Sequence, residues 1–135
     1  GCHPCDANVC ESHLIVVVTE PGGGPLQAGN YVIDLTVDGV TDAATCDIGP
    51  GGATATCSAL AMADLSAPRD DSPSNPLERL TLTWRPTVPE VVKIHIEHDG
   101  VVVLDTTVEP AYDPVDETCA PGCNQPSEDL VLDRG

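Results

Sequence analysis

The stretch from Val91 to Val108, VVKIHIEHDGVVVLDTTV, is the most strongly patterned part of the chain. Apolar and polar residues alternate before the Asp99-Gly100 pair and again after it. Alternation with period two is typical of a strand with one buried face, and an Asp-Gly pair between two such runs is typical of a tight turn. The stretch therefore predicts a β-hairpin with one apolar face that must pack on something.

The length of the turn decides which residues of this hairpin lie opposite one another. A two-residue loop would set Ile94 opposite Asp105, whereas a three-residue HDG loop sets Ile94 opposite Leu104. We therefore predict the three-residue loop, which needs Gly100 in the left-handed conformation. In that register Lys93 lies opposite Asp105 on the outer face, as a favourable pair of opposite charges.

Short segments of the same kind recur along the chain and are separated by Gly and Pro turns. The β-branched core residues and the near absence of aromatic side chains favour strands over helices, and Trp84 is expected to anchor the core. We predict an all-β, immunoglobulin-like antiparallel β-sandwich of about seven strands, stapled by disulfides, with a closed barrel as the alternative. The further strands are expected at residues 13–19, 29–37, 40–48, 78–85 and 129–133, and one short helix at residues 58–66.

The length of 135 residues suits one core rather than two. We expect a Cys-rich N-terminal tether at residues 1–12 and a sandwich domain at residues 13–109. Residues 110–135 are expected to form a tail with a Cys pair, packed on the sandwich or swapped to a neighbour.

The Gly51-Gly52 pair predicts the most specific crosslink. A turn centred there sets Cys46 directly opposite Cys57. Opposed residues of an antiparallel pair lie about 4.5–5.5 Å apart, which a disulfide can bridge. The alternative is a wider loop with these cysteines paired elsewhere.

Seven cysteines in so short a chain predict an oxidising compartment, and hence a secreted, periplasmic or outer-membrane protein of a bacterium. A lipoprotein signal peptide is cut between a small residue and a cysteine that then carries the lipid, and Gly1-Cys2 matches this junction. Cys2 is therefore the expected lipidation site; a free or paired Cys2 is the alternative. The remaining Cys5, Cys10, Cys119 and Cys123 then form two further disulfides, for which we favour bridges between the two tails.

The same cysteines allow a metal site as the weaker alternative. Cys2-His3-Pro4-Cys5 has the spacing of half a zinc site, and His13 could add a ligand if the tails meet. Disulfides are the simpler outcome in an exported chain, so we predict no bound metal and no cofactor. His95 and His98 point to opposite faces of a strand and are not expected to share an ion.

The formal charge of −17 repels phosphate groups, so we do not expect the protein to bind nucleic acid. No serine lies in a G-x-S-x-G frame, and no Gly-rich loop precedes a helix. We therefore predict no catalytic residues.

The segment KIHIEHDGVVVLDTTVEPAYDPVDETCAPGC, residues 93–123, resembles the closing hairpin of small secreted β-sandwich lipoproteins of myxobacteria-like bacteria. In these proteins a strand, an Asp-Gly turn and a second strand run into a C-x-P-x-C end. The resemblance covers about a quarter of the chain. It implies a surface or periplasmic sandwich domain and carries no catalytic residues.

Taken together, these features predict a non-enzymatic exported β-sandwich with a structural or binding role, anchored to a membrane by a lipid on Cys2 and binding a protein or carbohydrate. The alternatives are a subunit of an extracellular fibre or layer that assembles by β-strand addition, and a metal-dependent enzyme that uses the tail Cys and His residues. Self-association is expected through one of two apolar segments, Leu14, Ile15, Val16, Val17 and Val18 or Leu130, Val131 and Leu132.

Overall fold

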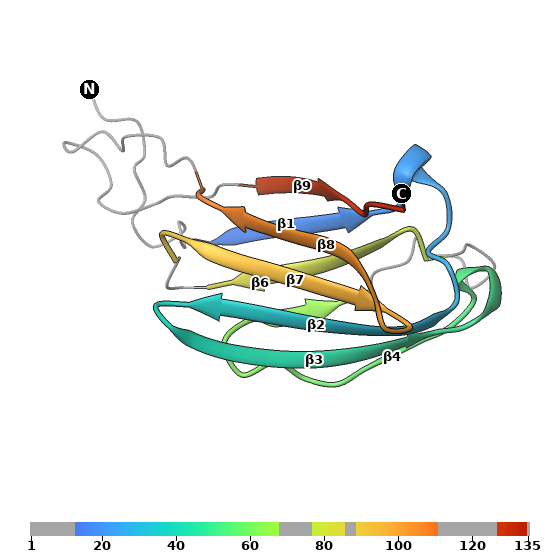
Figure 1. Cartoon of the computed structure of the whole chain (residues 1–135), viewed down its shortest axis with the longest axis horizontal. Helices are drawn as coiled ribbons and strands as arrows, with labels where there is room; N and C mark the ends of the chain where they lie inside the picture. The colour runs from blue at the N-terminus through green and yellow to red at the C-terminus, as the bar shows by residue number, and fades with distance from the viewer. Residues whose placement is uncertain (1–12, 68–76, 86–88, 111–126, 135) are drawn as a thin grey trace, which may run out of the picture.

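The computed structural model describes residues 13–67, 77–85, 89–110 and 127–134 and shows a two-layer β-sandwich (Figure 1). One sheet has the order β5-β6-β1-β9 and the other the order β4-β3-β2-β7-β8. No helix in these ranges is long and apolar enough to cross a membrane. The strands are β1 (Leu14–Thr19), β2 (Gly29–Val37), β3 (Val40–Ile48), β4 (Ala55–Cys57), β5 (Asp64–Ser66), β6 (Arg79–Trp84), β7 (Val92–His98), β8 (Val101–Val108) and β9 (Ser127–Val131).

The strand order confirms the predicted immunoglobulin-like sandwich and corresponds to the order of strands in a variable-type domain. Such a domain has strands A, B, E and D in one sheet and G, F, C, C′ and C″ in the other. Strands β1 to β8 take the places of B, C, C′, C″, D, E, F and G in that order. The place of strand A, beside β1, is taken by β9, which runs parallel to β1. All other strand pairs are antiparallel.

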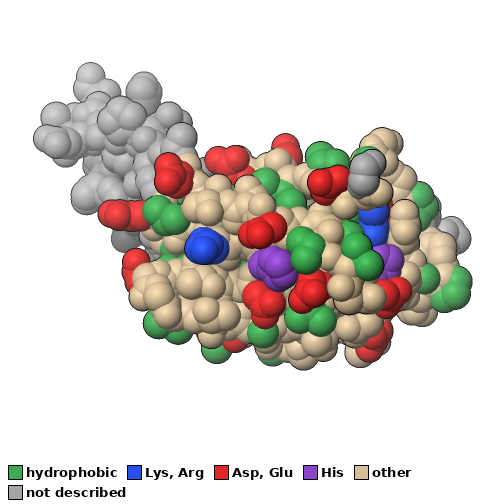
Figure 2. Space-filling model, viewed as in Figure 1, with side chains coloured by type: hydrophobic (Ala, Val, Ile, Leu, Met, Phe, Trp, Pro, Cys, Tyr) green, Lys and Arg blue, Asp and Glu red, His purple; other side chains and the backbone are tan. Residues whose placement is uncertain are grey.

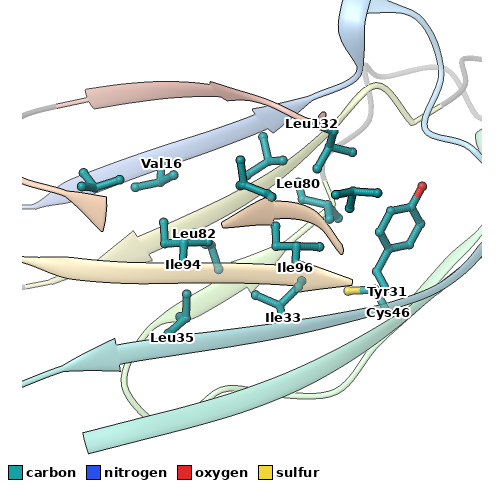
Figure 3. Packing of buried hydrophobic residues seen from close by; sticks show 14 of the residues in the cluster. Val16, Tyr31, Ile33, Leu35, Cys46, Leu80, Leu82, Ile94, Ile96 and Leu132 are labelled. Carbon is teal, nitrogen blue, oxygen red and sulfur yellow. The ribbon is translucent and has the colours of Figure 1, made fainter. Parts of the chain in front are cut away.

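The core lies between the sheets and is built from alternate residues of each strand (Figure 3). Ile33 and Ile94 from one sheet point toward Val16 and Leu82 of the other. Each fully buried aliphatic side chain contributes about 1.5–3 kcal/mol relative to an exposed one. Trp84 is almost completely buried at one end of the core, as the sequence predicted.

The β7–β8 hairpin differs from the prediction in its register. Its turn contains two residues, Asp99 and Gly100, both with positive φ, and His98 is the last residue of β7. A β-bulge at Val103 then shifts the ladder by one residue, so that Leu104 lies opposite Ile96 rather than opposite Ile94 as predicted. The three-residue loop was therefore wrong, because a bulge restores the apolar face without a longer turn.

The observed register also changes the cross-strand pairs that were predicted on the polar outer face of the hairpin. Lys93 lies opposite Thr107, and His95 lies opposite Asp105. The expected ion pair between Lys93 and Asp105 is therefore wrong.

The segment predicted as a short helix, residues 58–66, is not helical. It crosses from β4 in one sheet to β5 in the other. Asp42, on the inner parity of β3, accepts hydrogen bonds from the backbone N–H groups of Ala61 (2.6 Å) and Met62 (2.9 Å). This carboxylate holds the crossing segment against β3, which pairs with β4 only over its last three residues.

Two short strands, β4 and β5, raise the number of strands in the described residues to nine, compared with about seven predicted. The connection between β3 and β4 is wider than a two-residue turn: it contains the 3-10 turn η2 (Pro50–Gly52) and closes with a hydrogen bond from Gly49 N–H to Thr54 O. A second 3-10 turn, η1 (Pro21–Gly23), follows β1.

Candidate functional site

A buried polar cluster joins the C-terminal segment to one end of the sandwich. Glu20 follows β1, Tyr31 lies on β2, His98 ends β7, and Arg134 lies beyond β9. The Arg134 guanidinium donates to both Glu20 carboxylate oxygens, from Nε at 2.7 Å and from Nη2 at 2.5 Å. Nη2 also donates to the Tyr31 hydroxyl at 2.9 Å. This fork is the geometry in which arginine binds a carboxylate most strongly.

The cluster fixes the tautomer of His98. Arg134 can only donate hydrogen bonds, so the contact of 2.6 Å from its Nη1 requires His98 Nδ1 to accept. The carbonyl of Ala28 can only accept, so His98 Nε2 donates to it at 2.8 Å. The imidazole stacks on the Tyr31 ring, with centroids 4.2 Å apart.

The charges of the cluster compensate one another. Burial alone would raise the pKa of Glu20, but hydrogen bonds from Arg134 and from the Gln27 backbone outweigh it and hold the pKa below its ordinary value. The hydrogen bond to Glu20 raises the pKa of Arg134 further above its ordinary value. Burial raises the pKa of the Tyr31 phenol, with Arg134 opposing the change.

At the same end of the molecule, the backbone at the start of β2 lies close to the β7–β8 turn. Gly29 has a φ of 138°, and a Cβ there would collide with the His98 ring and the Asp99 carboxylate. Asn30 N–H donates to Asp99 Oδ1 and Asn30 O accepts from Asp99 N–H, both at 2.8 Å. The β7–β8 turn is thereby fastened to the start of β2.

The C-terminal segment is held at three further points. Leu132 N–H donates to Thr19 O, and Asp133 N–H donates to Val103 O in the bulge of β8. The Leu132 side chain is fully buried. Residues 132–134 thus connect β1 of one sheet to β8 of the other, and His98 and Arg134 also line a hollow of about 480 Å³ beside this segment.

A hollow of about 610 Å³ lies at the opposite end of the sandwich. Trp84 is buried beside it, and its indole Nε1 has no hydrogen-bond partner among the described residues. A buried donor without a partner is costly, and each such group in a native structure calls for an explanation, such as a strained site, a functional role or a bound water or ion. The hollow is lined by Val37, Asp38, Val40, Met62, Trp84, Pro89 and Glu90.

The structure tests one of the predicted disulfides. Cys46 and Cys57 lie opposite one another on β3 and β4, with Cα atoms 4.1 Å apart, and form a disulfide. This prediction is confirmed, although the loop between the strands is wider than expected. The remaining predicted disulfide cysteines, Cys5, Cys10, Cys119 and Cys123, and the predicted lipidation site Cys2 lie outside the described residues.

The two predicted self-association segments differ in their accessibility. Strand β1 is paired on both sides, with Leu14, Val16 and Val18 buried and Ile15 and Val17 half-buried on the outer face. Strand β9 lies at the edge of its sheet and leaves Val131 54% exposed. Among the described residues, β9 has an unpaired edge and β1 has none.

The sequence contained little signal for the Arg134 cluster. Its members are separated by up to 114 positions and belong to no motif. A buried glutamate directly after a continuous apolar strand is the one local hint, since a buried carboxylate requires a partner.

A scan against protein-family models found no match, and the searches of curated proteins and of solved structures found none either.

Proposed function

We propose that the protein is a non-enzymatic exported β-sandwich of the bacterial cell surface or periplasm, with a binding or structural role. The Cys46–Cys57 disulfide supports export, because structural disulfides persist in oxidising compartments. The charge of −17 suits a protein that stays soluble and avoids anionic polymers. The resemblance of residues 93–123 to secreted sandwich lipoproteins points the same way, and a lipid on Cys2 would supply the anchor.

The hollow beside Trp84 is the observation that carries the binding role. It combines the carboxylates of Asp38 and Glu90 with apolar walls that include Trp84. Ligand sites typically consist of an apolar concave surface with a few polar groups. Two carboxylates that can accept hydrogen bonds beside an aromatic residue suit a hydroxyl-rich ligand, so carbohydrate is the ligand class we propose.

Trp84 is the only tryptophan of the chain, so its fluorescence can report on this hollow directly. Oligosaccharides from the producing cell's envelope should change the emission of the full chain and saturate. Glu90→Gln should weaken binding, whereas Glu109→Gln, an exposed carboxylate on the β8 side, should not. A Glu90→Gln variant that binds as tightly as the wild type would contradict the assignment.

Export and anchoring are tested separately. The intact mass of the protein from its own cells should include a lipid on Cys2, and membrane association should disappear in Cys2→Ser. A cytoplasmic protein with reduced thiols would refute the proposal.

Assembly by strand exchange is the second candidate, and the position of β9 favours it. This strand lies in the place that strand A takes in an immunoglobulin domain, at a sheet edge, and is separated from β8 by 18 residues. Exchange between copies would preserve every contact of the Arg134 cluster. Cysteines at Val17 and Asp129, which lie side by side on β1 and β9, would then crosslink different chains rather than one chain.

A metal-dependent enzyme built on the tail Cys and His residues is the third and weakest candidate, and no described residue bears on it. Stoichiometric metal in the purified full chain would favour it.

A further inference from the structure

We propose that the outer face of the five-stranded sheet binds a divalent transition-metal ion of the Zn²⁺ class through Asp34, His95 and Glu97. One ligand atom from each of these residues lies within 4.8 Å of the other two. The proposal is independent of the carbohydrate site and of strand exchange, because it concerns a different face of the sandwich.

The register of the sheet creates this group. His95 on β7 lies directly between Asp34 on β2 and Asp105 on β8. Glu97 lies two residues along β7, and therefore on the same face. Figure 2 shows a histidine surrounded by acidic side chains, with one basic side chain nearby, on the face formed over β2 and β7.

The distances fit ligands of one ion better than direct hydrogen bonds. His95 Nε2 and Glu97 Oε2 are 3.7 Å apart, which is too long for a hydrogen bond. Two ligand atoms on a tetrahedral ion, each about 2.0–2.1 Å from the metal, lie about 3.4 Å apart. Closing the group onto an ion therefore requires side-chain movements of about 1 Å, and the side chains of His95 and Glu97 are both only 35% exposed.

Asp105 occupies the position of an orienting carboxylate. It lies 3.9 Å from His95 Nδ1, on the opposite side of the ring from the nitrogen that faces Glu97. Metal-bound histidines usually donate their second N–H to a carboxylate, which fixes the ring and strengthens its basicity. Asp105 is therefore a positioning residue rather than a ligand.

The ligand set determines the class of ion. One imidazole nitrogen favours Zn²⁺ and its neighbours over Ca²⁺ and Mg²⁺, which prefer oxygen ligands. Lys93 is on the same face, opposite Thr36 and Thr107, one row away from the group. Three protein ligands leave at least one coordination position toward solvent.

The test is calorimetric titration of ZnCl₂ into the oxidised full chain, with every thiol left free after oxidation alkylated. One ion per chain should bind. His95→Gln should weaken binding at least tenfold, and Asp105→Asn about tenfold. His13→Gln is the matched control, because it removes a histidine outside the group, and its affinity should equal that of the wild type.

A second readout keeps the test independent of small losses of stability. In ¹H–¹⁵N spectra, Zn²⁺ should shift the amides around residues 34, 95, 97 and 105, and CaCl₂ at the same concentration should not. Equal Zn²⁺ affinity in wild type and His95→Gln, loss of binding in His13→Gln, or shifts spread over the acidic surface would each overturn the proposal.

Discussion

Two hairpins of the five-stranded sheet, β2–β3 and β7–β8, begin with the same kind of turn and continue differently. In β2–β3 the turn is Asp38-Gly39, and in β7–β8 it is Asp99-Gly100, with φ values of 51° and 78° against 50° and 85°. The β2–β3 ladder stays regular for nine residue pairs, whereas the β7–β8 ladder shifts at Val103. A turn thus fixes the register only nearby, and the burial pattern fixes it farther along the strand.

The irregular hairpin contacts the C-terminal segment through its backbone and its turn, whereas the regular hairpin contacts it through the Tyr31 side chain of β2. The bulge presents Val103 O to Asp133 N–H, and His98 at the end of β7 contacts Arg134. Bulges often occur where a strand must redirect a group toward a special contact. The bulge in β7–β8 therefore positions the Val103 carbonyl to accept a hydrogen bond from the C-terminal segment.

Arg134→Ala should have the largest effect and should act more strongly on the β7–β8 hairpin than on β2–β3. It leaves Glu20 buried without its cation, which costs about 3 kcal/mol of unfolding free energy in urea titrations. Amide exchange should accelerate in β9 and in the β7–β8 turn, and in β2–β3 only at the start of β2, where Tyr31 contacts Arg134. Arg85→Ala is the control, because its ion pair with Asp64 is largely exposed and should contribute less than about 1 kcal/mol. A similar loss in both variants would contradict the proposed role of the cluster.

Removal of one valine from Val101–Val103 should make the second hairpin as regular as the first. The remaining cross-strand pairs are unchanged, but the buried Val103 side chain and its carbonyl contact are lost, at a cost of about 2–3 kcal/mol. The Asp133 amide should lose protection in exchange measurements. Val103→Ala keeps the bulge and should keep that protection; protection in the deletion variant would show that the bulge does not hold the segment.

Gly39→Ala and Gly100→Ala should have equal effects, because the turns are alike even though the ladders differ. A Cβ at either position meets no atom within 4 Å, so the cost is backbone strain alone, about 1 kcal/mol. Gly24, with a φ of −85° and equally open space, is the control and should tolerate alanine without loss. Thermal unfolding of the three variants measures this, and a difference of more than about 0.5 kcal/mol between the two turns would show that they are not equivalent.

Acidification should produce the smallest effect on the free energy of unfolding. The effect predicted here arises from Glu20, at the end of the sandwich that holds the C-terminal segment. The pKa of Glu20 is lower in the folded chain than in the unfolded chain, so its contribution to stability is present above the unfolded value of about 4.3 and is lost as the pH falls through the folded value. Unfolding free energies measured between pH 7 and pH 3 should decrease more steeply for the wild type than for Glu20→Gln. Parallel curves would refute this contribution.

Alternation and turn residues were sufficient to predict most of the fold. Gly29–Val37 and Val40–Ile48 were predicted with the bounds that the structure shows, because Asp38-Gly39 joins two regular strands. The same reasoning failed at Asp99-Gly100, since it assumed an uninterrupted ladder. Ala-rich residues 58–66 suggested a helix by intrinsic propensity, but backbone contacts to Asp42 determined the outcome.

The candidate sites were harder to predict because they depend on register and on distant contacts. Predicting Lys93 opposite Asp105 moved His95 away from its carboxylate neighbours and concealed the group around it. The pairing of Glu20 with Arg134 spans nearly the whole chain, and no periodicity encodes it. The disulfide was predictable because a local turn brings Cys46 and Cys57 together.

Parallel pairing of β1 with β9 also determines how the sandwich responds to force. Leu14, at the start of β1, and Val131, at the end of β9, lie at opposite ends of the same strand pair. Tension between these two points pulls the neighbouring strands past each other and loads their slanted hydrogen bonds together rather than one at a time. A chain pulled by these ends in a single-molecule experiment should therefore resist as a shear-loaded unit, and Arg134→Ala should lower the rupture force.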